Sequence, residues 1–222
     1  MHASIVSPNL HLFHSAGRLH RAPAAALLLC ATALLSSCVG IDSTATINRD
    51  GSGTIDLRYL VSKMLVSVGS LEANGSLIPF PVSRQDFDAT VRGIEGLTLV
   101  SYAQKETQED LVVDARLAFA SPRALASFLD PKGQRATYTE DGGRKTLAIV
   151  LASGGPGLDP DVARLVDAAF APYKVSIVVK LPSPALSTGI GASSAGGTQL
   201  AWSSLVPALA KSREKIVWQF SW

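Results

Sequence analysis

The stretch IDSTATINRDGSGTIDLRYLV, residues Ile41–Val61, decides the fold that the sequence predicts. Apolar and polar residues alternate on both sides of its centre, which is the pattern of two half-buried strands. The centre contains Asp50-Gly51, and this dipeptide favours the positive φ angles of a tight hairpin turn. We therefore expect an antiparallel hairpin with strands at Ile41–Ile47 and Thr54–Val61. Its inward-facing residues are Ile41, Ala45, Ile47, Ile55, Leu57, Tyr59 and Val61.

Downstream of the hairpin, the sequence repeats one arrangement, a helix followed by strands. Ser83, Ser121 and Asp159 precede apolar stripes with helical spacing and are typical helix N-caps. Proline follows Ser121 and Asp159 at the first helical position, where its missing N–H costs nothing. Alternating segments predict further strands at 97–104, 111–119, 135–139, 144–152, 175–181, 199–205 and 216–222. The units share no side-chain motif, so they do not indicate a repeat array.

These elements predict an α+β fold, a mainly antiparallel sheet with helices packed on one face. Hairpins imply antiparallel pairing, and strands with a single apolar face imply that the other face meets water. In the helix that follows Asp159, the residues that we expect to be buried are Val162, Leu165, Val166, Ala169 and Phe170. The small side chains that we expect to face the core are Ala45, Ala115, Ala148 and Ala169.

Upstream of the hairpin, residues Ala24–Cys38 (AAALLLCATALLSSC) have the features of a signal peptide. Basic residues precede this apolar run, which is too short to cross a bilayer as a permanent helix. Its end, Leu35-Ser-Ser-Cys38, resembles the bacterial lipobox, in which small residues precede a cysteine that is lipidated. We expect residues 1–37 to be a cleaved lipoprotein signal peptide and residues 38–222 a single domain. The alternative is an ordinary secretory signal, or a short buried helix, in which Cys38 is incidental.

Cleavage before Cys38 would change the available chemistry. It would remove 37 of the 222 residues, leaving 185, and all four histidines and Cys30 would leave with the leader. With Cys38 lipidated, no imidazole and no free thiol would remain. This excludes Cys/His and Ser/His/Asp catalytic centres, His-liganded zinc and a disulfide framework. Arg18 and Arg21 would also leave, so that 18 basic residues face 18 acidic ones, without the basic run that nucleic-acid binding requires.

Two later segments stand out by their composition. Leu77-Ile-Pro-Phe-Pro-Val82 is apolar, but its two prolines keep it out of a central strand. We interpret it as a loop packed across the core edge or, alternatively, as an apolar lip that touches lipid or frames a ligand entrance. The candidate lip residues are Leu77, Ile78, Phe80 and Val82. Residues 182–198 are rich in Pro, Gly, Ser and Ala and predict a flexible loop; their glycines lack the spacing of a phosphate-binding loop, so we expect no cofactor.

The carboxylates give little indication of catalysis. Close pairs occur at Asp86 and Asp88, at Asp159 and Asp161, and at Glu140 and Asp141. Helix capping and solvated turns account for each pair, so we assign no catalytic or metal-binding residue. One alternative stays open, a small envelope enzyme that uses Asp, Lys or Ser chemistry without His or Cys.

Two runs of the sequence have a recognisable order. One is Cys38-Val-Gly-Ile-Asp42 with the strand, turn and strand that follow; the other is Leu181-Pro182 before a Gly/Ser-rich loop and a strand with Trp202. Together they resemble the LppM-domain lipoproteins of bacteria over most of residues 38–222. The resemblance implies an envelope-exposed mixed α/β domain without established catalysis, likened to small lipid-binding domains. Some members carry a C-terminal transmembrane helix, and because no such run precedes Trp222 the expected anchor is Cys38 alone.

The sequence thus predicts a membrane-anchored, non-enzymatic lipoprotein of the bacterial envelope. Two hypotheses stay open for its function. It docks a protein partner through its exposed sheet face or final strand, or it binds lipid or another apolar ligand between the sheet and its helices. The expected partners are the membrane, through Cys38, and an envelope protein or lipid, but no nucleic acid. Val39-Gly40 places no Asp directly after the cysteine, which favours the outer membrane if the organism is diderm.

Overall fold

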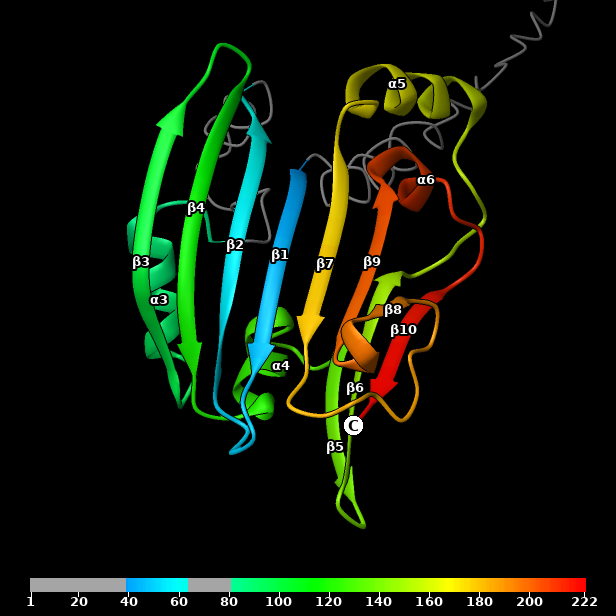
Figure 1. The fold of residues 1–222 in the computed structure, drawn as a ribbon. Coiled ribbons are helices and arrows are strands. Elements are labelled where there is room, and N and C mark those ends of the chain that lie inside the picture. The colour runs from blue at the N-terminus through cyan, green and yellow to red at the C-terminus, as the bar shows by residue number, and fades with distance from the viewer. Residues whose placement is uncertain (1–38, 64–80) are drawn as a thin grey trace, which may run out of the picture.

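The computed structural model describes residues 39–63 and 81–222 (Figure 1). These residues form ten strands, four helices and one 3-10 turn. The strands are β1 (Val39–Ile47), β2 (Gly53–Ser62), β3 (Leu97–Glu106), β4 (Asp110–Phe119), β5 (Ala136–Asp141), β6 (Arg144–Ala152), β7 (Lys174–Lys180), β8 (Ala192–Ser194), β9 (Gln199–Leu205) and β10 (Ile216–Ser221). The helices are α3 (Arg84–Arg92), α4 (Pro122–Leu129), α5 (Pro160–Phe170) and α6 (Val206–Ala210), and the 3-10 turn is η2 (Ala195–Gly197).

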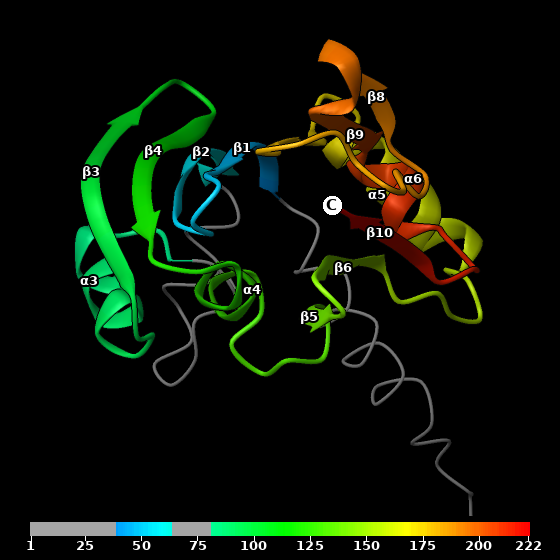
Figure 2. The ribbon, with the colours of Figure 1, turned by 60° about the horizontal axis from the view of Figure 1, so that its bottom comes forward.

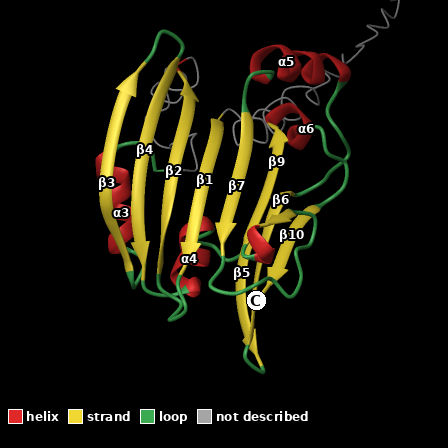
Figure 3. Cartoon of the chain, in the orientation of Figure 1, coloured by secondary structure: helices red, strands yellow, loops and turns green. Residues whose placement is uncertain are grey.

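The strands form two sheets, one of seven strands and one of three. The larger sheet has the order β3-β4-β2-β1-β7-β9-β8, and every neighbouring pair is antiparallel except β1 and β7. The smaller sheet has the order β10-β6-β5 and is antiparallel throughout. Figure 3 shows the larger sheet face on, with the smaller sheet behind its β9 side. The predicted α+β fold with a mainly antiparallel sheet is confirmed, and the division into two sheets is an addition that the sequence does not reveal.

The predicted hairpin consists of β1 and β2, which pair along their whole length. In the turn, the Gly51 N–H donates to the Asn48 carbonyl at 3.0 Å. Gly51 has a φ of 88°, a left-handed conformation that glycine adopts without the steric cost of a Cβ. The hairpin turn therefore lies at Asp50-Gly51, where the sequence predicts it.

A second glycine of this turn, Gly53, is required by packing. A Cβ at this position would lie 2.0 Å from the Thr46 carbonyl oxygen and 2.4 Å from the Phe119 ring. These distances are far shorter than van der Waals contact, so no larger residue fits without moving β1 or the ring. The ring of Phe119 thus packs directly on the backbone at the start of β2.

The predicted helix N-caps are present in the structure. The Ser83 hydroxyl accepts the Asp86 N–H at 3.2 Å, and the Asp86 carboxylate accepts the Ser83 N–H at 2.9 Å, which is a reciprocal capping box. The Ser121 and Asp159 side chains likewise accept N–H groups in the first turns of α4 and α5. Each helix therefore begins where the sequence places its cap.

One face of the seven-stranded sheet, its inner face, is covered by α3, α4 and the three-stranded sheet (Figure 2). Large side chains from all these elements fill the space between the layers, and each is at most 1% exposed. Examples are Leu117 of β4, Phe87 of α3, Leu147 of β6, and Trp218 and Phe220 of β10. The helices α5 and α6 lie at the end of the sheet where β7 begins and β9 ends (Figure 1). In the described ranges, no helix has both the length and the apolar character to span a membrane.

Two residues predicted to be buried are not. Leu165 was expected in the buried stripe of α5, but it is 64% exposed, because the core contacts this helix on a narrower strip around Val166 and Phe170. Ala148 was expected to face the core, but Leu147 faces the core instead, and Ala148 lies on the outer face of the smaller sheet beside Thr137. Both predictions were wrong because alternation and helical spacing do not show how far a neighbouring layer extends.

The segment predicted to be a flexible loop, 182–198, contains β8 and η2. Its earlier part runs along β10, where the Leu186 N–H donates to the Ser221 carbonyl at 2.7 Å and the Trp218 indole N–H donates to the Thr188 carbonyl at 3.0 Å. These contacts cannot be predicted from the glycine-rich composition of the segment. Gly191 lies against the Trp218 ring, where a Cβ would come within 2.6 Å of the indole nitrogen.

Candidate functional site

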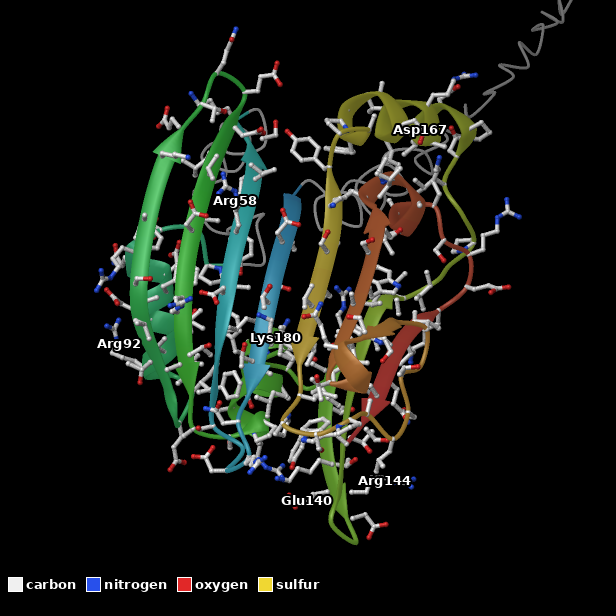
Figure 4. All side chains as sticks on the ribbon, viewed as in Figure 1. Arg58, Arg92, Glu140, Arg144, Asp167 and Lys180 are labelled. Carbon is white, nitrogen blue, oxygen red and sulfur yellow. The ribbon has the colours of Figure 1, made fainter. Side chains whose placement is uncertain are left out.

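Five charged side chains from three neighbouring strands of the seven-stranded sheet line one hollow on its outer face. They project outward because they alternate along each strand with residues that face the core. We call this group the charged face. It consists of Asp42 of β1, Asp56 and Arg58 of β2, and Asp114 and Arg116 of β4. Figure 4 shows side chains on this side of the sheet, with Arg58 labelled on β2.

Strand register places opposite charges across from one another on the charged face. Arg58 lies opposite Asp114 on one side and Asp42 on the other, and Asp56 lies opposite Arg116. Arg58 Nη1 is 3.4 Å from Asp114 Oδ1, and Arg116 Nε is 2.5 Å from Asp56 Oδ1. The hydrogen bond to Asp56 raises the pKa of the Arg116 guanidinium above its ordinary value. The four paired side chains contact one another and yet remain between 43% and 51% exposed.

The charged face surrounds an open hollow of about 450 Å³, which Thr44 and Ser101 also line. Its three carboxylates outnumber its two guanidinium groups, so the hollow has one net negative charge at neutral pH. Asp42 is exposed, and none of the residues in 39–63 and 81–222 forms an ion pair with it. This carboxylate is therefore available to a basic group of a bound molecule.

A second hollow of about 550 Å³ lies on the outer face of the three-stranded sheet, at its β5–β6 hairpin. Threonines and one glutamine line most of it, and Asp141 and Arg144 lie near the hairpin tip. The polar residues are Thr137, Thr139, Asp141, Arg144, Thr146 and Gln219. Figure 4 labels Arg144 at this tip. Both hollows are thus open to solvent, and charged or hydroxyl-bearing side chains line each of them.

A tyrosine crosses the outer face at the end of the sheet where β1 starts. Tyr173 directly precedes β7, and its hydroxyl donates to Asp110 Oδ1, at the start of β4, at 2.6 Å. A Cβ on Gly40 would lie 3.3 Å from the Tyr173 ring, so the ring passes over Gly40. Burial, together with the Asp110 hydrogen bond, raises the pKa of Tyr173 to about 12. This side chain connects β7 with β4 across the two strands between them.

The site residues predicted from the sequence fall mainly outside the described part of the chain. This applies to Cys38, the predicted lipidation site, and to Leu77, Ile78 and Phe80 of the predicted lip. Val82 is described, and it lies just before α3, partly buried against the core. Its carbonyl accepts the Tyr102 hydroxyl at 2.8 Å. The structure therefore gives Val82 a packing role and leaves the other four residues as predictions.

The carboxylates that lie close together in the sequence serve local structure. Asp86 and Asp159 cap α3 and α5, while Asp88 and Asp161 pair with arginines of the same helices. Glu140 accepts the hydroxyl of a neighbouring tyrosine at 2.9 Å. Partial burial raises the pKa of Asp86, but the hydrogen bonds at the helix cap outweigh this effect and hold it below its ordinary value.

The described ranges contain neither histidine nor cysteine, and no cluster of three or more Asp or Glu in them could hold a metal ion. The charged face as a unit was missed by the sequence reasoning, although a signal exists. The same pattern, Asp-x-Arg, occurs at Asp56–Arg58 and at Asp114–Arg116. When two such strands pair antiparallel in this register, each Asp faces an Arg. The pattern becomes informative only once β2 and β4 are known to be neighbours.

The resemblance to the LppM-domain lipoproteins rests on two runs of the sequence, one starting at Cys38 and the other at Leu181-Pro182. In comparisons with known proteins, no family model, no curated protein and no solved structure matches this chain.

Proposed function

We propose that this chain is a lipoprotein of the bacterial envelope that is anchored through a lipidated Cys38 and docks a partner protein on its charged face, without catalysing a reaction. The runs around Cys38 and Leu181-Pro182 support a place among the LppM-domain lipoproteins. The proposed location is the envelope, and the outer membrane if the organism is diderm.

The observation that carries the docking proposal is the state of the charged face. Strand register places Asp56 opposite Arg116 and Arg58 opposite Asp114, while about half of each side chain stays accessible. Groups that are already ordered lose little further conformational freedom when a partner binds. Complementary charges also guide the encounter and select the partner. The face therefore offers a prearranged pattern of charges at small entropic cost.

The chemistry of the charged face suggests the chemistry of its partner. The excess carboxylate and the exposed position of Asp42 favour a protein surface with a basic side chain at its centre. The two guanidinium groups of the face, in turn, favour acidic side chains around that centre. We infer a partner whose contact surface is mixed in charge and slightly basic.

Docking is preferred to the binding of an apolar ligand because of what lines the available space. Binding sites for apolar molecules are concave and mostly apolar. Charged or hydroxyl-bearing side chains line both hollows, which are open to solvent. The space between the two sheets is occupied by Trp218, Phe220 and other fully buried side chains.

Site-specific photo-crosslinking in cells of the source organism tests the docking proposal. A photoreactive amino acid at Ser101 lines the hollow of the charged face, and the matched control at Thr137 lines the polar hollow of the smaller sheet. We expect an adduct with one protein from position 101 and not from 137. The double substitution Asp56→Arg with Arg116→Asp retains an ion pair but reverses its direction, and we expect it to abolish that adduct while the thermal stability stays close to that of the wild type.

Several outcomes would contradict the proposal. Equal crosslinking at both positions, or an adduct that persists after the charge reversal, would show that the charged face does not select a partner. A lipid that co-purifies with the chain and exchanges in displacement assays would favour the apolar-ligand alternative. For the anchor, labelling by a palmitate analogue should be lost in Cys38→Ala, and a mutant that is still labelled would refute lipidation at this residue.

A further inference from the structure

The proposed lipid attachment directly adjoins folded structure. β1 begins at Val39, the residue that follows Cys38 in the sequence. Consecutive Cα atoms of a chain are about 3.8 Å apart. A lipid on Cys38 would thus be joined to the sheet without a spacer, so the end of the sheet at which β1 begins must lie at the membrane surface.

The start of β1 is held in place on several sides. Val39 pairs with Val61 of β2, and from Ile41 onward the strand also pairs with β7. On the outer face, the Tyr173 ring covers Gly40, and its hydroxyl is fastened to β4 by the bond to Asp110. The first residues of β1 could act as a linker only if these contacts were broken. The domain therefore has little freedom to move away from its attachment point.

Two helices lie at this same end of the sheet. Because β1 and β7 are parallel neighbours, β7 also begins here, directly after α5. β9 is antiparallel to β7, so it ends here, at Leu205, and continues into α6. Figure 1 shows α5 and α6 at the end where β1 starts. Lys211 Nζ lies 2.5 Å from Asp167 Oδ1 and connects the two helices.

Two large apolar side chains are exposed at this end. Leu165 of α5 is 64% exposed, and Leu205 at the end of β9 is 54% exposed. Charged neighbours of Leu165 are neutralised in pairs, Arg164 by Asp161 and Asp167 by Lys211. A surface of exposed leucines with paired charges suits the boundary between lipid head groups and acyl chains.

We infer that the end of the domain bearing α5 and α6 rests on the bilayer that holds Cys38, with Leu165 and Leu205 inserted at the lipid interface. This inference depends on the proposed lipid anchor. It also orients the charged face, since β1 then runs away from the membrane. At about 3.3 Å per residue, Asp42 lies about 10 Å along the strand from Val39. The charged face is thus presented to the side, close above the lipid head groups.

Fluorescence quenching in vesicles tests this orientation with the full-length lipidated protein. With Cys30 removed and Cys38 acylated, Leu165→Cys introduces the sole free thiol, which is labelled with an environment-sensitive dye. Leu186→Cys is the matched control. Leu186 is 62% exposed, and its N–H donates to the carbonyl of Ser221, next to the C-terminus at the opposite end of the domain (Figure 1). Both proteins are reconstituted in phosphatidylcholine vesicles that contain nitroxide-labelled lipids. Leu205→Cys provides a second site at the inferred interface.

We expect blue-shifted emission and strong quenching at positions 165 and 205, and neither effect at 186. Equal quenching at 165 and 186, or no quenching at 165 in protein that floats with the vesicles, would overturn the orientation and leave the anchor intact. Protein that is not lipidated and does not float would overturn the anchor and the inference together. Matching thermal unfolding of the three variants excludes misfolding as the cause, since all three leucines are exposed.

Discussion

The two faces of the seven-stranded sheet belong to the same strands but meet different surroundings. On β4, Leu117 is fully buried, whereas Asp114, three positions earlier, is 43% exposed. The inner face is stabilised by the removal of apolar surface from water, which is the largest favourable term in folding. The outer face keeps its charges hydrated, where ion pairs contribute little to stability. Stability therefore resides mainly in one face, and this leaves the other free to carry a binding pattern.

The difference between the two faces can be tested by truncating one residue on each face of β4. Leu117→Ala should lower the free energy of unfolding by about 2–5 kcal/mol, because it removes buried methyl groups and leaves a cavity. Asp114→Ala should change it by only about 0.5 kcal/mol, since the ion pair with Arg58 is half exposed. Urea unfolding of both variants measures the difference. Similar losses would mean that the outer face contributes to stability as much as the core.

The inner face also depends on a glycine that allows close packing. Gly53→Ala should cost about 3 kcal/mol, because the new methyl group would collide with the Thr46 carbonyl and the Phe119 ring. Gly155→Ala is the matched control: a Cβ there meets no atom within 4 Å. Thermal unfolding should show a large loss for the first variant and none for the second. An unchanged melting temperature for Gly53→Ala would show that the start of β2 can move.

On the outer face, Tyr173 also contributes to stability, through the hydrogen bond of its hydroxyl to Asp110. Tyr173→Phe should cost about 1 kcal/mol at neutral pH through loss of the hydrogen bond to Asp110. The pKa of Tyr173 is raised from 10.0 to about 12, so its neutral form is favoured in the folded state. Its contribution is therefore complete below pH 10 and is lost as the pH rises towards about 12. The free energy of unfolding, measured between pH 10 and pH 12, should decline less steeply with pH in Tyr173→Phe than in the wild type. Equal slopes for the two proteins would refute the role of this hydroxyl.

The smallest effect expected is the coupling between ion pairs of the charged face. A double-mutant cycle on Arg58 and Asp114 should give about 0.5 kcal/mol, reduced at high salt by screening. The same cycle on Arg58 and Asp42 serves as the comparison, since these residues face each other in register without an ion pair. We expect its coupling to be close to zero. A larger value for the second cycle would mean that Arg58 pairs with Asp42 in solution.

Local features could be predicted from the sequence with good accuracy. The hairpin turn at Asp50-Gly51, the caps at Ser83, Ser121 and Asp159, and the strands that follow are all present in the structure. Turn and cap preferences act over a few residues, so the sequence displays them directly. Leu165 and Ala148 were misplaced, because their burial depends on how wide a distant layer is.

The candidate sites differ in the same way. Cys38 is predicted from a run of adjacent residues, since a signal peptidase reads its substrate as an extended local segment. The charged face needs β2 and β4 to be neighbours in one particular register, and the tie from Tyr173 to Asp110 joins residues 63 positions apart. No short window of sequence contains either relation.

The positions of most strands and helices, and the apolar side of most strands, can be predicted from the sequence, because side-chain alternation and helix caps follow from backbone geometry over a few residues. Three further features become visible only in the folded molecule: β1 lies parallel to β7, β10 joins a second sheet, and Asp56 meets Arg116. These choices depend on the packing of layers that are distant in the chain. A shift of register by one residue would turn every side chain of a strand to the other face. The same packing therefore determines both the core and the pattern of charges on the outer face of the sheet.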